Sequence, residues 1–240
     1  MNVDKQIQTV RRFEEYYADI PFPERKVEDF RYYFENGFYS YTDAIFLYSM
    51  MRHFRPKRIV EMGSGFSSAL MLDTNELFFK DSIGLTFIEP YPERLKSLLK
   101  PKDANSTTII EKRVQDVSLE TFDDLGPGDF LFIDSTHVSK TGSDVNHIIF
   151  QILPRLSPGV MIHFHDIFYP FEYPRKWVYE GRSWNENYIV KAFLMYNEQF
   201  EIRLFSDYLH RFHRELFSEM PLCYKNNGGN LWIEKRLLPA

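Results

Sequence analysis

The sequence predicts an α/β fold built on a Rossmann-like, doubly wound sheet of seven strands. From residue 58 onward, short apolar segments alternate with helical ones, which favours parallel strands with helices on both faces. The first of these strands, Arg58–Met62, runs directly into the turn Gly63-Ser64-Gly65. A glycine turn between a strand and a helix is typical of sites where the backbone approaches a ligand closely.

Length and composition fit one such domain with an addition in front of it. The 240 residues are 44% hydrophobic and 26% charged, which predicts a sizeable packed core. We divide the chain into an N-terminal helical extension or lid (1–57) and the α/β domain (58–240). The net charge of −5, with no stripe of lysine and arginine, argues against a nucleic-acid partner.

The sequence carries the features expected of a soluble cytoplasmic protein. Its single cysteine, Cys223, rules out an intrachain disulfide and a cysteine-based zinc site. The first residues are too charged for a secretory signal. No apolar run reaches the roughly 18 residues that a membrane helix needs, so we expect no membrane partner.

The N-terminal region has helical and aromatic character. Helical spacing covers residues 3–18, and Pro21 and Pro23 then interrupt the chain. Aromatic residues crowd the stretch 30–41, and a second helix begins at Thr42 or Asp43. A lid over a ligand, a helical layer and a homodimer surface all remain open for this region.

The elements after residue 57 follow one another in alternation, and glycine–proline turns at 126–128 and 157–159 separate several of them. The stretch 168–175 is predicted to be a loop. Strands are expected at Arg58–Met62, Gly84–Glu89, Ser106–Arg113, Asp129–Asp134, Val160–His165, Phe200–Phe205 and Asn230–Arg236, and helices at Ser67–Phe79, Pro92–Leu99, Ser143–Leu153 and Asn185–Tyr196.

Polar residues gather where the strands end, which is where doubly wound sheets bind ligands. The first strand end offers a carboxylate and the N-terminus of a helix, the second an acid suited to ribose hydroxyls, and the third an acid beside an adenine ring. The candidate residues for binding a nucleotide-like cofactor are Glu61, Gly63, Ser64, Gly65, Ser67, Ser68, Glu89, Pro90, Asp116, Val117 and Asp134.

These residues resemble the motifs of class I S-adenosylmethionine-dependent methyltransferases over roughly residues 58–236. Residues 61–65 match the family's first motif, Glu89 its ribose acid and Asp116 its adenine-side acid. Residues 133–137 and 163–166 resemble a branch rich in small-molecule and sugar O-methyltransferases. The resemblance implies an antiparallel last strand, S-adenosyl-L-methionine as cofactor, and methyl transfer to a hydroxyl of a small molecule or sugar, as in small-molecule biosynthesis.

That branch implies two ways of removing the proton of the acceptor hydroxyl. In its metal-dependent members, Asp134, His165 and Asp166 would hold a divalent metal such as Mg²⁺, although histidine suits softer metals better. Without a metal, His137 or His165 would act as a general base. Asp166 is a further candidate catalytic residue, because an acid at the end of an apolar strand has little structural purpose.

Three other functions remain open. An N-methyltransferase would carry the same cofactor residues. An NAD-dependent oxidoreductase shares the glycine turn, although Ser68 stands where its third glycine is expected. A non-catalytic binding domain would keep the fold alone. Among the other histidines, His163 is predicted to lie in the core, and His210 and His213 on a solvated helical face rather than in a metal site.

Overall fold

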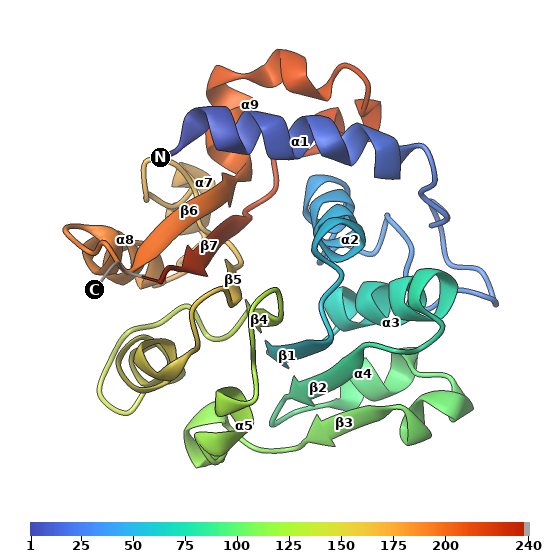
Figure 1. The fold of residues 1–240 in the computed structure, drawn as a ribbon, viewed down its shortest axis with the longest axis horizontal. Helices are drawn as coiled ribbons and strands as arrows, with labels where there is room; N and C mark the ends of the chain where they lie inside the picture. Colours follow the sequence, from blue (N-terminus) through green and yellow to red (C-terminus); the bar gives the residue numbers. More distant parts are fainter. Residues whose placement is uncertain (238–240) are drawn as a thin grey trace.

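The computed structural model describes residues 1–237, so residues 238–240 of the predicted second domain lie outside it. It contains one seven-stranded sheet in the order β3-β2-β1-β4-β5-β7-β6, in which β7 alone runs antiparallel to the rest (Figure 1). The predicted fold class is therefore confirmed. The strands are β1 (Arg58–Met62), β2 (Gly84–Ile88), β3 (Thr107–Ile110), β4 (Phe130–Ile133), β5 (Met161–Phe164), β6 (Phe200–Phe205) and β7 (Leu231–Lys235).

The register of the central strands brings their carboxyl ends to one edge of the sheet. Met62 at the end of β1 lies opposite Ile88 of β2 and Ile133 of β4. The residues that follow these three strands therefore meet beside one another. The strand order reverses between β1 and β4, which is the place where a doubly wound sheet opens a crevice for a ligand.

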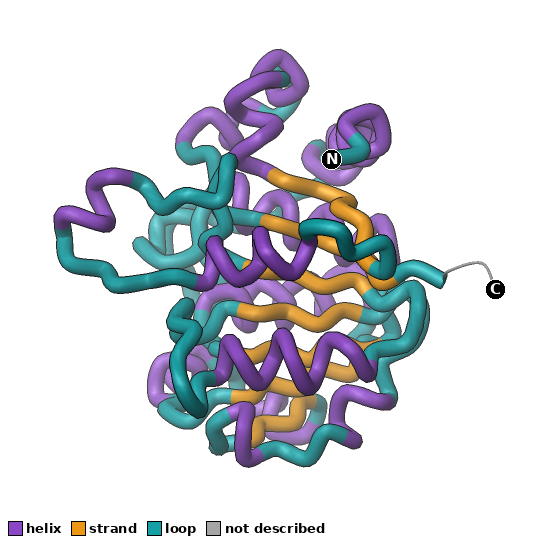
Figure 2. The backbone as a smooth tube through the Cα atoms, turned by 90° about the vertical axis from the view of Figure 1, so that its left-hand side faces the viewer, coloured by secondary structure: helices purple, strands orange, loops and turns teal. Residues whose placement is uncertain are grey.

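Helices cover both faces of the sheet (Figures 1 and 2). One face packs against α1 (Val3–Tyr17), α2 (Thr42–Phe54), α3 (Phe66–Phe79), α4 (Glu93–Leu98) and α9 (Ser206–Phe212). The other packs against α5 (Glu120–Asp123), α6 (Asp144–His147) and α8 (Glu186–Leu194). Neighbouring β4 residues point to opposite cores, Phe132 to the first and Ile133 to the second, as the pleat of a strand requires.

Some elements differ from those predicted. The helix expected over 143–153 begins as α6, continues as a π-helical turn at Ile148–Ile152 and ends in a 3₁₀ turn at Leu153–Arg155. Pro154 stands in that last turn, and a proline has no N–H to continue the helix. The short helices α5 and α7 (Arg175–Tyr179) had no clear sequence signal.

Two histidines are buried in the packing. His163 is fully buried, and its ring stacks on Phe132 at 4.0 Å, so the predicted core position is confirmed. His210 is also buried: its ring stacks on Phe217 at 3.9 Å, and its Nε2 lies 3.2 Å from Thr42 Oγ1. The prediction of a solvated face was wrong for His210, because α9 packs against the N-terminal helices.

The N-terminal extension shares its core with the sheet. Residues of α1 and α2 belong to the same apolar cluster as those of β4 and β7. The side-chain oxygen of Gln6 accepts a hydrogen bond from the backbone N–H of Phe205 at 2.9 Å, across 199 positions of sequence. No helix within residues 1–237 combines the length and apolar character needed to cross a bilayer.

Candidate active site

The turn after β1 requires glycine at its first position. Gly63 has φ +82°, and a Cβ on it would lie 1.7 Å from the carbonyl oxygen of Asp134. Its N–H donates to the carbonyl of Ile88 at 3.1 Å. At the start of α3, Ser68 Oγ accepts a hydrogen bond from the N–H of Gly65 at 3.0 Å. The turn is therefore held against the ends of β2 and β4.

Glu61 supports this turn from inside the sheet. Its fully buried carboxylate accepts hydrogen bonds from the hydroxyls of Ser67, at 2.5 Å, and Ser68. Burial raises the pKa of Glu61 to about 8, against the lowering effect of these hydrogen bonds. Glu61 fixes the start of α3 and does not line the cavities beside the turn.

A cleft lies along the carboxyl ends of β1, β2 and β4, in two adjoining halves. One half, of about 510 Å³, lies over the glycine turn, and the other, of about 400 Å³, extends toward β3. The halves share Gly63, Glu89, Asp134 and Ser135 as walls. Ser64, Gly65 and Ser67 line the first half, and Pro90, Val114, Gln115 and Ser143 line the second.

Glu89 stands at the boundary between the two halves. Its Oε2 accepts a hydrogen bond from the N–H of Ser64 at 3.1 Å, and its Oε1 accepts one from the N–H of Tyr91 at 2.8 Å. These bonds fix the carboxylate at the end of β2. This is the position from which an acid bonds ribose hydroxyls in folds of this kind.

Two residues predicted beside adenine lie away from the cleft walls. Asp116 is exposed and pairs with the guanidinium of Arg113 at 2.8 Å, which lowers the pKa of Asp116. Val117 packs in the core, and Val114 and Gln115 line the cleft instead. Residues 114–116 form a 3₁₀ turn, whose side chains point about 120° apart, so Asp116 faces solvent when its neighbours face the cleft.

Polar side chains from the segments after β4 and β5 and from α8 meet around His137. Its Nε2 lies 3.3 Å from Asp134 Oδ1 and 3.8 Å from Asp166 Oδ2, and its Nδ1 lies 2.8 Å from Glu186 Oε2. Burial opposes a charge on His137, but hydrogen bonds to Asp134 and Glu186 outweigh it and raise its pKa well above 6.5. We call these four residues, together with His165, the histidine cluster. Nothing in the sequence had marked Glu186.

His165 lies near Oδ1 of Asp166, whereas His137 lies near Oδ2. The Nε2 of His165 is 3.6 Å from Asp166 Oδ1, and its Nδ1 has no hydrogen-bond partner among the described residues. Burial lowers the pKa of His165, but the charges of Asp166, Asp134 and Asp43 outweigh burial and raise it. Asp43, from α2, accepts a hydrogen bond from the N–H of Gly229 at 2.8 Å, and burial raises its pKa to about 6.

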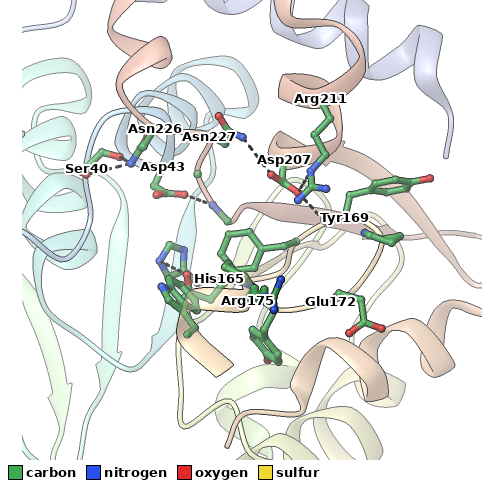
Figure 3. A pocket seen from close by; sticks show the side chains of 18 of the residues that line it. Ser40, Asp43, His165, Tyr169, Glu172, Arg175, Asp207, Arg211, Asn226 and Asn227 are labelled. Carbon is green, nitrogen blue, oxygen red and sulfur yellow. Dashed lines mark hydrogen bonds and ion pairs between the residues drawn. The ribbon is translucent and has the colours of Figure 1, made fainter. Parts of the chain in front are cut away.

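A second cavity, of about 610 Å³, opens beside the histidine cluster (Figure 3). It shares Phe38, His165, Asp166 and Trp177 with the cleft half over the glycine turn. We call it the acceptor pocket. Its other walls are aromatic (Phe168, Tyr169, Tyr173) and polar (Ser40, Asp43, Glu172, Arg175, Asp207, Arg211, Asn226, Asn227).

The predicted metal residues do not form a ready set of ligands. Within residues 1–237, no group of three or more His, Cys, Asp or Glu side chains is arranged to hold a metal ion. The imidazole Nε2 of His137 lies within 4 Å of one carboxylate oxygen of Asp134 and one of Asp166. A hard cation would need these oxygens as its ligands. Binding of a metal by Asp134, His165 and Asp166 stays a prediction that this arrangement does not favour.

Comparison with known proteins finds similarity to methyltransferases in the central part of the chain. Residues 60–167 match the family model of a methyltransferase domain. An uncharacterized protein of Archaeoglobus fulgidus is 34% identical over 129 residues, which are 52% of this chain and 57% of that protein. The matched part therefore spans little more than half the length of this relative.

Two solved structures share the fold. The S-adenosylhomocysteine-bound methyltransferase PaMTH1 of Podospora anserina is 16% identical, with 95% of this chain and 88% of that one covered and a TM-score of 0.52. The O-methyltransferase TomG of Streptomyces achromogenes, solved with S-adenosylmethionine, is 14% identical, with 97% and 90% covered and a TM-score of 0.52. These two structures show the fold, and with the family model they confirm the predicted resemblance to methyltransferases.

Proposed function

We propose that this S-adenosylmethionine-dependent methyltransferase moves the methyl group to a hydroxyl oxygen of a small molecule or sugar. The observation that supports this is the junction of the two cavities at His165 and Asp166. A hydroxyl held in the acceptor pocket at that junction faces the cleft half over the glycine turn. That half is where the methionine end of the cofactor fits, since the ribose acid Glu89 marks its far side.

The chemistry needs an aligned nucleophile and a proton acceptor. The cofactor supplies a methyl group on a sulfonium. The acceptor oxygen forms a bond to the methyl carbon as the sulfur–carbon bond breaks, and the hydroxyl proton leaves. We assign this proton to the imidazole of His165, because His165 lines both cavities at their junction and an imidazole can act as a general base. Asp166, 3.6 Å from the imidazole Nε2, stabilises the resulting charge.

His137 takes a different part. Both of its ring nitrogens face carboxylates, Asp134 at 3.3 Å and Glu186 at 2.8 Å, and these carboxylates favour the protonated imidazole. A protonated imidazole has no lone pair for the acceptor's proton. We therefore assign His137 to holding Asp134 and Asp166 in place by its positive charge, and not to general base catalysis.

The same arrangement supports a metal-free route. A divalent ion such as Mg²⁺ would have to displace the imidazole of His137 from Asp134 and Asp166. Removal of metal by a chelator should therefore leave the rate unchanged. Loss of turnover on chelation, restored by magnesium, would instead support the metal-assisted alternative.

The acceptor pocket suits a polar molecule with a flat face. Tyr173 and Trp177 offer rings for stacking on a sugar or an aromatic acceptor, and Asp43 and Glu172 offer carboxylates for its hydroxyls. Those carboxylates also suit a cationic amine. N-methylation is therefore the second candidate, and the products of an acceptor screen would distinguish it.

The first test is calorimetric titration with S-adenosylhomocysteine, with NAD as the control ligand. We expect binding of the first ligand only, unaffected by magnesium. Transfer of a labelled methyl group to a panel of sugars, phenols and amines then identifies the acceptor atom. Binding of NAD in place of S-adenosylhomocysteine would overturn the proposal, and cofactor binding without transfer to any acceptor would favour a binding domain.

A further inference from the structure

Arg94, on α4, brings a positive charge to the cleft half over the glycine turn. Two other arginines on the cleft walls have carboxylate neighbours: Arg113 lies 2.8 Å from Asp116, and Arg182 lies 3.8 Å from Glu180. Arg94 has no carboxylate oxygen within the 4.0 Å limit of an ion pair in the part of the chain that the structure describes. Its guanidinium therefore borders the cleft without a direct ion pair, although burial of Asp134 is offset by the charges of His165, His137 and Arg94, which lower the pKa of Asp134.

The side chain of Arg94 is exposed and rests on an aromatic ring that is itself partly exposed. The guanidinium lies over the ring of Phe38, 4.0 Å from the ring centre, and Phe38 in turn stacks on Phe66 at 5.8 Å. The aliphatic stem crosses the glycine turn, where a Cβ on Gly65 would lie 3.1 Å from Arg94 Cδ. An arginine seated on an aromatic face keeps its hydrogen-bonding edge directed sideways. That edge borders the same cavity as Ser64 and Gly65.

The ligand expected in this half carries charges of both signs. The amino-acid end of S-adenosylmethionine has an ammonium and a carboxylate. Glu89, Asp134 and Asp166 supply negative charge for the ammonium, but they repel the carboxylate. A guanidinium matches a carboxylate in shape and can donate two parallel hydrogen bonds to it.

We propose that Arg94, seated on Phe38, binds the carboxylate of the cofactor's methionine moiety. This inference rests on the proposed function, because it takes S-adenosylmethionine as the ligand of the cleft. It also gives the N-terminal extension a direct part in cofactor binding, since Phe38 comes from that extension and borders both the cleft and the acceptor pocket.

The test compares two ligands that differ only in the carboxylate. S-adenosylhomocysteine has it, and decarboxylated S-adenosylhomocysteine keeps the ammonium without it. Arg94→Met retains much of the aliphatic stem and removes the charge. We expect its Kd for S-adenosylhomocysteine to rise about 10- to 100-fold, the range for a lost charge-assisted hydrogen bond, and its Kd for the decarboxylated ligand to stay within about twofold.

Lys96→Met is the matched control. Lys96 lies on the same helix and pairs with Glu111 at 2.6 Å, away from the cleft walls. Its removal should change neither affinity. Arg94→Lys should recover part of the lost affinity, because a lysine keeps the charge but not the paired donors. Thermal unfolding of each variant confirms that it is folded.

The outcomes separate this inference from the proposed function. If the wild-type protein fails to bind S-adenosylhomocysteine, the proposed function falls. The wild-type protein could bind the cofactor and transfer methyl groups while Arg94→Met weakens the binding of both ligands equally or of neither. In that case only the role of Arg94 is overturned. Selective loss for the ligand with the carboxylate supports the inference.

Discussion

Two clusters of charged side chains in this protein differ in the distances between their cationic and anionic groups. In the first, the Arg31 cluster, the guanidinium contacts three carboxylates: its Nη1 lies 2.6 Å from Asp73 and 2.8 Å from Glu76, and its Nη2 lies 2.5 Å from Asp103. In the histidine cluster, His137 lies 2.8 Å from Glu186, but the distances from imidazole nitrogens to Asp134 and Asp166 are 3.3 to 3.8 Å. We call the first cluster closed and the second open, because the contacts to Asp134 and Asp166 are long.

The atoms left without partners show the same contrast. His165 Nδ1 and Glu186 Oε1 in the histidine cluster have no hydrogen-bond partner among the described residues. Asp134, His137, His165 and Asp166 line cavities, whereas no cavity described above touches the Arg31 cluster. Satisfied charges hold a fold in place, and charges with spare bonding capacity beside a cavity can respond to a ligand.

The Arg31 cluster ties the N-terminal extension to the α/β domain. Asp73 on α3 also accepts hydrogen bonds from the backbone N–H groups of Arg31 and Tyr32, at 2.9 and 2.8 Å. Burial opposes ionisation of Glu76, but hydrogen bonds from Lys102 and Arg31 outweigh it and lower its pKa to about 2. The stretch that follows this anchor carries Phe38 to the cleft, so the closed cluster positions residues around the open one.

The largest effect is expected from breaking the closed cluster. Arg31→Met leaves buried carboxylates without their cation and should lower the free energy of unfolding by about 3–5 kcal/mol. Urea unfolding followed by circular dichroism measures this loss. Arg25→Met is the control, because Arg25 is exposed and lies 3.8 Å from Glu35, so no measurable change is expected. Equal stabilities of the two variants would show that the Arg31 cluster is not an anchor.

A smaller effect is expected from changing charge beside the open cluster. In Asp43→Asn, a neutral side chain replaces a carboxylate that raises the pKa of His165. Because the negative charge favours the imidazolium, its removal lowers that pKa. His165 is then free to accept a proton at lower pH, and the rising limb of the pH–rate profile should move down by about one unit.

Steady-state rates measured between pH 5 and pH 9 test this shift. Glu172→Gln is the matched control, since Glu172 lines the same pocket but is not among the charges that shift the pKa of His165. It should leave the midpoint of the profile in place even if it changes affinity for the acceptor. A shift of the midpoint to higher pH in Asp43→Asn would contradict the assignment of His165 as the base.

Local sequence patterns, together with the family resemblance, were sufficient to predict the sheet and the strand ends along which the cleft lies. β1, the glycine turn, α3, β2 and Glu89 follow one another within about thirty residues, so their geometry is set by short connections. The residues that complete both clusters come from distant segments. His137 meets Glu186 across 49 positions, and Arg31 meets Asp103 across 72. Such contacts depend on how helices pack, and neither periodicity nor motif spacing encodes them.

The smallest effect should come from Asp116, which belongs to neither kind of cluster. Its carboxylate lies off the walls of the cleft, although its partner Arg113 borders them, and exposed pairs contribute little. In calorimetric titrations, Asp116→Ala should change the Kd for S-adenosylhomocysteine by less than about twofold. Glu89→Ala, at the boundary of the two halves of the cleft, should raise it about tenfold or more. A large loss of affinity in Asp116→Ala would mean that the 3₁₀ turn rearranges around the cofactor. The exposed carboxylate of Asp116 would then bind the ligand, as the side chains of the open cluster can.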